Sequence, residues 1–304
     1  MGYNPNITSD SYSSFKKSRN ITNQSSFTDI YKSTSTKKNY LPRNVTRESR
    51  DSDKHPNSTA VIFGIDSTGS MSSIYEAVAK KFETAVVEIF ERLPVPDPQI
   101  MFAAVDDVEA HGIDPLQVTQ FEVDNKIAEQ LFDLYYTGCG MGNGFESYQL
   151  LWYFASRHTS IDCYEKRKKK GILITVGDDG PQYTLKKRDI ERIFGDCEAH
   201  DMTAEELLNE VNKKFEVYHI CLEQGGSYRE SDYESWKKLI GSHALKLSNY
   251  QKLPELLVSV LEIYGGKSVN DTANSWDGST SVVIRDALSS LAVQSVGSGK
   301  LIKF

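Results

Sequence analysis

From residue 59 onward, short apolar runs alternate with longer segments in which apolar residues recur every three or four positions. The short runs are rich in Val, Ile and Phe, which is typical of buried strands. The longer segments have the spacing of amphipathic helices, and several of them end at Gly or Pro. Strands are predicted at residues 59–66, 99–107, 116–123, 171–179, 216–223 and 243–248. Helices are predicted at residues 74–93, 125–136, 145–158, 185–194, 202–215, 232–241 and 252–266.

The alternation of strands and helices predicts an α/β fold, namely a doubly wound, mostly parallel sheet with helices on both faces. The runs at 59–66 and 171–179 are apolar over most of their length, as in strands that are buried on both faces. The run at 116–123 alternates polar and apolar residues, and it is therefore predicted to be a half-exposed edge strand.

The composition divides the chain into three parts. Residues 1–58 are rich in Ser, Thr, Asn and Lys, with too little apolar surface to offset the entropy of ordering, so they are predicted to form a flexible polar arm. Residues 59–266 are predicted to be one α/β domain. Residues 267–304 turn polar again but contain a short apolar segment, and we expect this tail to dock on the domain or on a second copy.

Charge and composition restrict the class of partner. The chain has 304 residues, 39% of them hydrophobic and 25% charged, which is the balance of a soluble globular protein. The formal net charge of −7 disfavours nucleic acid as a partner. One basic run, residues 166–170, precedes an apolar strand, and we interpret it as the solvated lead-in to that strand.

The sequence also indicates a compartment. No apolar run reaches the roughly 18 residues that a membrane-spanning helix needs, and the polar N-terminus does not resemble a signal peptide. The four cysteines are scattered and are not spaced as metal ligands, so they are expected to be reduced thiols in a cytoplasmic setting. The six histidines form no ligand pair either, which argues against a zinc site.

Three segments bring polar chemistry to the carboxyl ends of predicted strands, where ligands gather in open α/β sheets. The first is Asp66-Ser67-Thr68-Gly69-Ser70, which follows an apolar strand. The second is the glycine-rich stretch 138–144, followed by Glu146. The third is the stretch 177–180, Gly-Asp-Asp-Gly, after another apolar strand. Carboxylates gathered at one edge repel each other, so either their pKa values are raised or a cation lies between them.

Alternate spacing in the first segment points to a metal. In a loop that leaves a strand, the first, third and fifth residues can face one centre, which here are Asp66, Thr68 and Ser70. One carboxylate and two hydroxyls make a hard, all-oxygen and weakly charged set of ligands. Such a set suits Mg²⁺ or Mn²⁺ and is unsuitable for zinc.

The pattern Asp66-x-Thr68-x-Ser70 at the end of an apolar strand resembles the metal-ion-dependent adhesion site (MIDAS) of von Willebrand factor type A domains, whose pattern is Asp-x-Ser-x-Ser. The likeness extends over about 200 residues in the order of elements. It implies a variant site in a member similar to those found inside bacteria or carried by phages. In the family, an Asp at the end of a later strand contacts the ion through water; here it matches Asp178, with Asp179 as the alternative.

The second loop departs from the usual pattern of the family. The family places a Thr in a Gly-Gly-Thr turn, which this chain lacks. The stretch 138–147 resembles instead a Gly-Gly-Gly-Asp-x-Pro-Glu loop of some members, so Asn143 takes the place of the acidic residue and Glu146 that of the Glu. The resemblance leaves both open as the further ligand, Asn143 through its amide oxygen or Glu146 through its carboxylate.

The resemblance implies adhesion and no enzymatic turnover. In the family, the ion keeps an open position that a carboxylate of a partner protein occupies, and hydroxyl ligands hold the ion without neutralising it. Members inside cells often work with AAA+ ATPases of the MoxR type, which the resemblance names as a candidate partner. The acidic residues Asp106, Asp107, Glu109 and Asp114 follow the second strand and are interpreted as a solvated loop.

Other functions fit the sequence less well. A haloacid-dehalogenase-like phosphotransferase also has an Asp after an apolar strand, but it needs an acid two residues later, where this chain has Thr68. A two-metal polymerase site lacks its second acidic cluster, and the glycine-rich stretch has the wrong spacing for a dinucleotide site. A structural assembly protein with a degenerate metal site, in which Ser70 or Ser73 only caps a helix, remains an open alternative.

Overall fold

The computed structural model describes residues 13, 17, 20, 32–139 and 145–292. Six strands form the central sheet in the order β12-β11-β7-β2-β3-β4. In chain order, these strands are β2 (Thr59–Asp66), β3 (Pro98–Val105), β4 (Leu116–Val118), β7 (Gly171–Gly177), β11 (Phe215–Leu222) and β12 (Ala244–Leu247). Neighbouring strands are parallel except for β4, which runs antiparallel to β3 at one edge. The predicted doubly wound, mostly parallel sheet is confirmed. The edge strand β4 lies where it was predicted, but the prediction that it is half-exposed is wrong: all three of its residues are buried, because Leu116 and Val118 pack in the core and the Gln117 side chain bonds the backbone of Tyr135.

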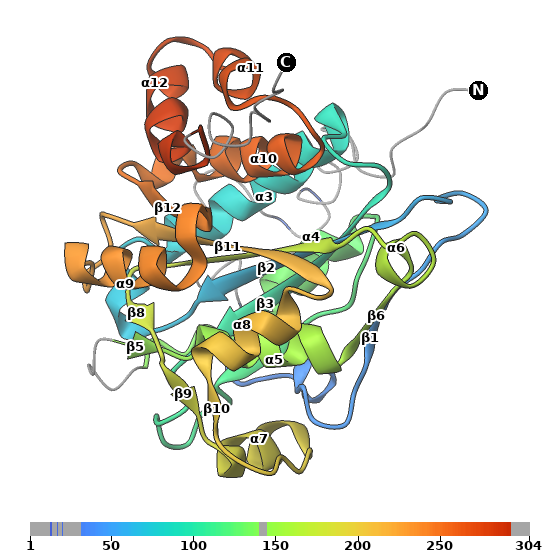
Figure 1. Cartoon of the computed structure of the whole chain (residues 1–304), viewed down its shortest axis with the longest axis vertical. Coiled ribbons are helices and arrows are strands. Elements are labelled where there is room, and N and C mark those ends of the chain that lie inside the picture. Colours follow the sequence, from blue (N-terminus) through green and yellow to red (C-terminus); the bar gives the residue numbers. More distant parts are fainter. Residues whose placement is uncertain (1–12, 14–16, 18–19, 21–31, 140–144, 293–304) are drawn as a thin grey trace, which may run out of the picture.

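Helices cover both faces of the sheet (Figure 1). On one face lie α3 (Tyr75–Arg92), α4 (Lys126–Asp133), α10 (Leu253–Tyr264), α11 (Val269–Asn274) and α12 (Gly278–Ala287). On the other lie α5 (Tyr148–Arg157), α7 (Lys187–Phe194), α8 (Ala204–Val211) and α9 (Glu230–Ile240). A short helix, α6 (Asp162–Glu165), leads into β7. Single 3₁₀ turns are η1 (Lys38–Tyr40), η2 (Gly69–Ser73), η3 (Gly241–His243) and η4 (Tyr250–Lys252).

The two layers of the core follow from the alternation of side chains along each strand. In β2, Val61, Phe63 and Ile65 pack with α3 and α10, whereas Ala60 and Ile62 belong to the core under α5. Every residue of β2 is buried, because both faces of this central strand are covered. The apolar run at 59–66 in the sequence therefore reflects burial on two sides.

Three pairs of short strands lie outside the central sheet. They are β1 (Arg47–Ser49) with β6 (Thr159–Ile161), β5 (Phe145–Glu146) with β8 (Gly180–Pro181), and β9 (Thr184–Leu185) with β10 (Met202–Thr203). The pair β5–β8 lies on the side of the molecule toward which β2 points (Figure 1). It brings the end of the second loop next to the segment that follows β7.

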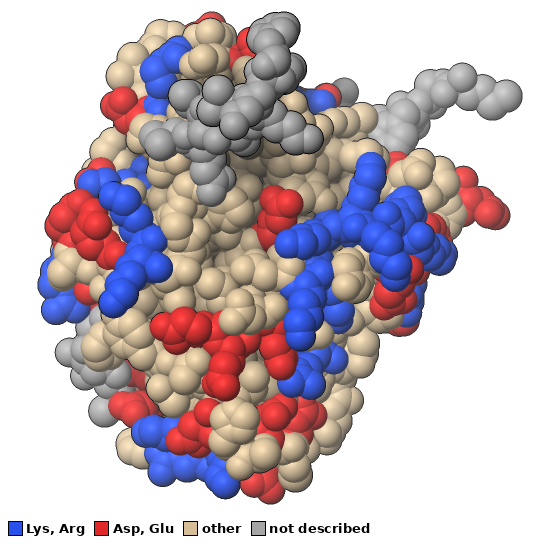
Figure 2. Space-filling model, viewed as in Figure 1, with Lys and Arg blue, Asp and Glu red and all other residues tan. Residues whose placement is uncertain are grey.

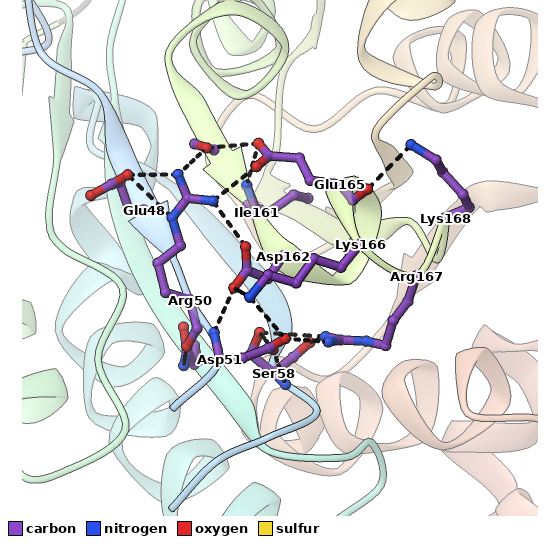
Figure 3. Close-up of polar contacts among 12 residues, drawn as sticks. Glu48, Arg50, Asp51, Ser58, Ile161, Asp162, Glu165, Lys166, Arg167 and Lys168 are labelled. Carbon is purple, nitrogen blue, oxygen red and sulfur yellow. Dashed lines mark hydrogen bonds and ion pairs between the residues drawn. The ribbon is translucent and has the colours of Figure 1, made fainter. Parts of the chain in front are cut away.

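The described parts of both terminal segments pack on the domain. Within residues 32–58, which the composition assigns to a polar arm, β1 pairs in parallel with β6. Polar contacts join the residues after β1 to α6 and to the loop behind it (Figure 3). At the other end, Trp276 lies under the Arg92 guanidinium, 3.7 Å from it, and its Nε1 donates to Ser259 Oγ at 2.8 Å. Ion pairs and hydrogen bonds thus hold the N-terminal segment, which is too polar for its docking to be predicted from apolar content. The C-terminal segment also buries apolar side chains of α12, as its short apolar stretch predicts.

Candidate metal centre

The candidate site lies where the order of the sheet reverses. Counted along the chain, the six strands of the sheet are arranged 6-5-4-1-2-3, so the first strand, β2, has β3 on one side and β7 on the other. The connections that leave β2 and β7 go to opposite faces of the sheet, to α3 on one face and to α7 and α8 on the other, and ligands bind at such a point in doubly wound sheets. Asp66 ends β2, and Asp178 directly follows β7.

Four side chains from these two strand ends form a continuous chain of contacts. Thr68 Oγ1 donates to Asp66 Oδ1 at 2.7 Å. Thr68 Oγ1 lies 3.1 Å from Ser70 Oγ, and Ser70 Oγ donates to Asp178 Oδ1 at 2.8 Å. Asp66, Thr68 and Asp178 are buried, whereas Ser70 is half-buried and forms the side of the cluster that solvent reaches. The structure therefore brings together four of the six residues that the sequence analysis names.

The number of protons available for hydrogen bonds in this chain of contacts is consistent with a bound cation. With Asp66 and Asp178 ionised, the single hydroxyl proton of Thr68 is used on Asp66 and that of Ser70 on Asp178. In this charge state no proton remains for the 3.1 Å contact between the two hydroxyl oxygens, so their lone pairs are free to face a cation. Oxygen ligands around Mg²⁺, at 2.0–2.1 Å from the ion, lie roughly 2.9 Å from one another. The donor set and its spacing therefore fit a small, hard cation.

The carboxylates of Asp66 and Asp178 are each fixed by hydrogen bonds from groups outside the chain of contacts. The Asp66 Oδ1 atom also accepts from the Thr68 N–H at 2.9 Å, and Asp66 Oδ2 accepts from Tyr148 OH at 2.6 Å. Asp178 Oδ2 accepts from the Ser227 N–H at 2.8 Å. At Gly177, a Cβ atom would lie 1.9 Å from Tyr148 OH, so only glycine leaves room for the tyrosine to reach Asp66. These contacts direct one oxygen of each carboxylate toward the hydroxyl pair.

The second loop closes over the first. The Gly138 N–H donates to the Ser67 carbonyl at 3.1 Å, and the Gly69 N–H donates to the Cys139 carbonyl. Tyr136 OH donates to the Thr68 carbonyl at 3.2 Å. These bonds fix the backbone of residues 67–69, and with it the directions of the side chains on either side.

Thr137 is a site residue that the sequence analysis missed. Its Oγ1 contacts Asp106 Oδ2 and lies 3.0 Å from the Ser67 carbonyl oxygen. It contributes a hydroxyl from the second loop beside the first, although it precedes the glycine-rich stretch and is not in a Gly-Gly-Thr turn. Its position directly before that stretch is the only signal in the sequence that could have identified it.

Of the two alternatives for the second loop, only Glu146 can be placed. Glu146 lies in β5, is 4% exposed, and its buried Oε2 has no hydrogen-bond partner among the described residues. Asn143 lies outside the described residues. Of the two candidate acids after β7, it is Asp178 that the Ser70 hydroxyl contacts. Asp179 instead lies 4.0 Å from the Arg229 guanidinium.

The electrostatics of the edge favour a cation. Burial, together with the charge of Asp178, raises the pKa of Asp66 to about 8. Burial and the charge of Asp66 raise the pKa of Glu146 to about 11. Burial also raises the pKa values of Asp178 and Asp106. Among the described residues, no Lys, Arg or His forms an ion pair with Asp66, Glu146 or Asp178, so an added cation is the natural counter-charge.

The acidic segment after β3 is partly buried, contrary to the interpretation as a solvated loop. Asp106 and Asp107 are each 1% exposed. Asp106 accepts from the Asp107 N–H at 2.7 Å and is contacted by Thr137. The backbone and hydroxyl donors of the neighbouring loops explain this burial, and these donors cannot be identified from charge pattern alone.

The candidate centre depends on hydroxyls as much as on carboxylates. Within the described part of the chain, no group of three or more His, Cys, Asp or Glu side chains is arranged to hold a metal ion. The Asp66, Thr68 and Ser70 set contains one carboxylate and two hydroxyls, so it lies outside such groups. The assignment of these residues as metal ligands stays a prediction. All four cysteines are free thiols, and no helix among the described residues is long and apolar enough to cross a membrane.

Comparison with protein-family models gave no match, and comparison with curated protein sequences gave none. Among solved structures, the chain is similar to the pilus adhesin SpaC from Lactobacillus rhamnosus GG in its open conformation. The TM-score is 0.49 and the sequence identity is 10%, and the match covers 74% of this chain and 31% of the adhesin. It is also similar to proximal thread matrix protein 1 from the mussel byssus, with a TM-score of 0.44 and 13% identity over 72% of this chain and 49% of that one. A second structure of the mussel protein, described as having a zinc-occupied MIDAS motif, gives a TM-score of 0.42 and 14% identity over 68% of this chain and 48% of that one. The chain thus spans less than half the length of each of these proteins.

Proposed function

We propose that this chain is a metal-dependent protein-binding module of the von Willebrand factor type A kind, with no enzymatic activity. The observation that carries the proposal is the chain of contacts Asp66–Thr68–Ser70–Asp178 at the point where the sheet order reverses. When Asp66 and Asp178 are ionised, no hydroxyl proton is left for the 3.1 Å contact between the Thr68 and Ser70 oxygens, and neither carboxylate forms an ion pair with a described Lys, Arg or His.

Each residue has a role in this proposal. Asp66 supplies the one anionic ligand, and Thr68 and Ser70 supply neutral oxygens. Asp178 orients the Ser70 hydroxyl and acts through it or through water. Glu146 or Asn143 supplies the further ligand from the second loop, and Thr137 supports that loop. Mg²⁺, or Mn²⁺, bound by one anion keeps enough positive charge to attract a carboxylate of a partner protein.

The half-buried Ser70 marks the side from which a partner carboxylate approaches. Because the remaining ligands are buried, the partner has to present its Asp or Glu on a protruding segment. An AAA+ ATPase of the MoxR type is the partner class that the resemblance suggests, and it stays a prediction, as does a cytoplasmic location, which the four free thiols suit. A phosphotransferase is disfavoured, since Thr68 is buried and donates to Asp66 where an acid would be needed.

The substitution Ser70→Ala tests the proposal with a close control. It removes one neutral ligand, and we expect the affinity for Mg²⁺, measured by isothermal titration calorimetry, to fall by about tenfold. Ser72→Ala, two residues away on the exposed side of η2, should leave the affinity unchanged. Equal affinities for the unaltered protein and both variants would refute the assignment of Ser70.

A second measurement tests the open position. With Mn²⁺ as the probe, the protein should enhance the relaxation of water protons, because exchangeable water fills that position. Acetate should reduce the enhancement by displacing this water. A bound Mn²⁺ that shows no enhancement, or release of phosphate from a generic phosphoester, would contradict a binding module with an open metal.

Tyr148 should determine which cation the centre prefers. Its hydroxyl occupies Asp66 Oδ2 at 2.6 Å, which leaves only Oδ1 for a metal. Mg²⁺ accepts such one-oxygen binding, whereas Ca²⁺ favours bidentate carboxylates and more ligands. In Tyr148→Phe, we expect the ratio of Mg²⁺ to Ca²⁺ affinity to fall by about tenfold. Tyr153→Phe on the same helix is the control, because its hydroxyl donates to Asp196, away from the centre; an unchanged ratio in Tyr148→Phe would contradict this role.

A further inference from the structure

We propose a second binding site, at the opposite edge of the sheet, that binds a phosphate-bearing anion. It lies at the amino ends of the strands, where the basic run 166–170 leads into β7, and it does not depend on the proposed metal centre. Figure 2 shows Lys and Arg side chains gathered over the end of the molecule where α6 lies in Figure 1. The basic run is thus part of a larger positively charged surface, which the sequence did not indicate.

A cavity of about 550 Å³ is present at this end. Its size is within the range of about 300–1,000 Å³ that is usual for small-molecule sites. The walls come from the start of β2, the segment before β3, the basic run, the start of β11 and the end of α10. The charged residues that line it are Arg167, Lys168, Lys169, Lys170 and Glu216.

Some of the cationic residues in the run form ion pairs with acidic side chains, and others do not. Lys166 pairs with Asp162 at 2.6 Å, and Arg167 pairs with Asp51 at 2.6 Å. In contrast, within the described part of the chain no acidic side chain forms an ion pair with the three lysines that line the cavity, Lys168, Lys169 and Lys170. The Lys168 ammonium donates a 3.2 Å hydrogen bond to the Glu165 carbonyl and makes a cation–π contact with the Tyr164 ring.

The neutralised residues hold the loop in place (Figure 3). Arg167 donates to Asp51 Oδ2 and to the Ser58 carbonyl, both at 2.6 Å, which ties the loop to the segment before β2. The loop turns at Lys168, whose φ of 56° is in the left-handed region. The Lys169 N–H then donates to the Cys163 carbonyl at 2.9 Å. The lysines are therefore presented from a fixed backbone, which reduces the entropy lost when an anion binds.

The balance of charge in the cavity indicates the class of ligand. Glu216 is the one acid among the lining residues, so the three lysines leave an excess of two positive charges. A phosphate monoester, which carries close to two negative charges at neutral pH, matches this excess. A long polyanion such as nucleic acid is disfavoured, because the whole chain has a net charge of −7. The ligand is therefore a small phosphate-bearing molecule or a phosphate headgroup that enters the cavity.

The test is a calorimetric titration of the full chain with inorganic phosphate and with pyrophosphate at low ionic strength. We expect saturable binding that weakens with added salt. The triple variant Lys168→Gln, Lys169→Gln, Lys170→Gln should lose affinity by a factor on the order of ten or more. A control with the same change in net charge, Lys187→Gln, Lys237→Gln, Lys238→Gln, alters exposed lysines of α7 and α9 and should bind as the unaltered protein does.

A second arm distinguishes the source of the phosphate. Vesicles of phosphatidylcholine with a phosphatidylinositol phosphate should co-sediment with the protein if a lipid headgroup is the ligand, and should not if the ligand is a free molecule. Backbone amide shifts of residues 163–170, recorded on the unaltered protein as phosphate is added, test the location without any substitution. The proposal is overturned if neither phosphate nor vesicles bind, or if the triple variant and its control lose affinity equally.

Discussion

Replacing Asp66 by Asn should abolish Mg²⁺ binding while making the metal-free protein more stable at pH 8. Asp66 is the one carboxylate in the proposed inner set of ligands, so its loss removes the main attraction for the ion, and we expect affinity to fall by about 100-fold or more. In the metal-free protein the same carboxylate is fully buried beside Asp178 and forms no ion pair with a described Lys, Arg or His, so a neutral amide of the same shape relieves repulsion. Calorimetry measures the first effect and urea unfolding the second.

The opposite signs of these two effects separate a binding role from a structural one. If Asp66 only capped the loop through Thr68 and Tyr148, the amide would weaken those bonds, and stability would fall without any change in a metal response. Asp53→Asn is the control for the change in charge, since Asp53 is exposed in the loop before β2. A variant that binds Mg²⁺ as tightly as the unaltered protein would overturn the proposed centre.

The position of Asp66 and Asp178 could be predicted because it depends on local pattern. Each follows an apolar strand, and parallel strands have their carboxyl ends at one edge of the sheet. The alternate spacing of Thr68 and Ser70 then follows from the geometry of a chain that leaves a strand. Local pattern brings the two strand ends to one edge, and the choice of Asp178 over Asp179 rested on the resemblance to the von Willebrand factor type A pattern.

Thr137 and Tyr148 could not be predicted because their roles are tertiary. Tyr148 lies within the helix predicted at residues 145–158, and nothing in the neighbouring sequence indicates that its hydroxyl reaches Asp66 on β2. Thr137 reaches the Ser67 carbonyl because the second loop closes over the first. The burial of Asp106 depends on the same closure, which is why its charge suggested a solvated loop.

The polar segment 32–58 illustrates the same limit for the fold. Its composition predicts an arm because apolar content is low, yet Arg50 contacts Asp162 at 2.9 Å and Asp51 accepts from Arg167. These partners lie more than 100 positions away in the chain, at 112 and 116 residues. Charge-assisted contacts at such a separation leave no periodic signal in either segment.

The stability of the metal-free protein should fall as pH rises from about 4 to about 8, and Mg²⁺ should restore it at the upper end. Burial and Asp178 raise the pKa of Asp66 from 3.8 to about 8, and burial raises that of Asp179 to about 6. Between the unfolded and folded pKa values the folded protein holds more protons, so the free energy of unfolding decreases with pH. The contribution is present below about pH 4 and lost as pH passes through the folded values. We expect a loss of several kcal/mol, the larger part of it from Asp66.

A cation changes this dependence because it binds only the ionised carboxylates. Urea unfolding of chelator-treated protein at pH 5 and pH 8, with and without Mg²⁺, measures the effect. A Mg²⁺ concentration 100 times the dissociation constant should add about 2.7 kcal/mol at pH 8 and far less at pH 5. In Asp66→Asn, both the pH slope and the response to Mg²⁺ should shrink together, since Asp66 contributes to both, and Asp179 should account for the pH slope that is left. The proposal would be contradicted if the stability of the metal-free protein stayed flat or rose between pH 5 and pH 8. That result would mean that groups of the protein itself neutralise the buried carboxylates, so that no cation is needed at this edge.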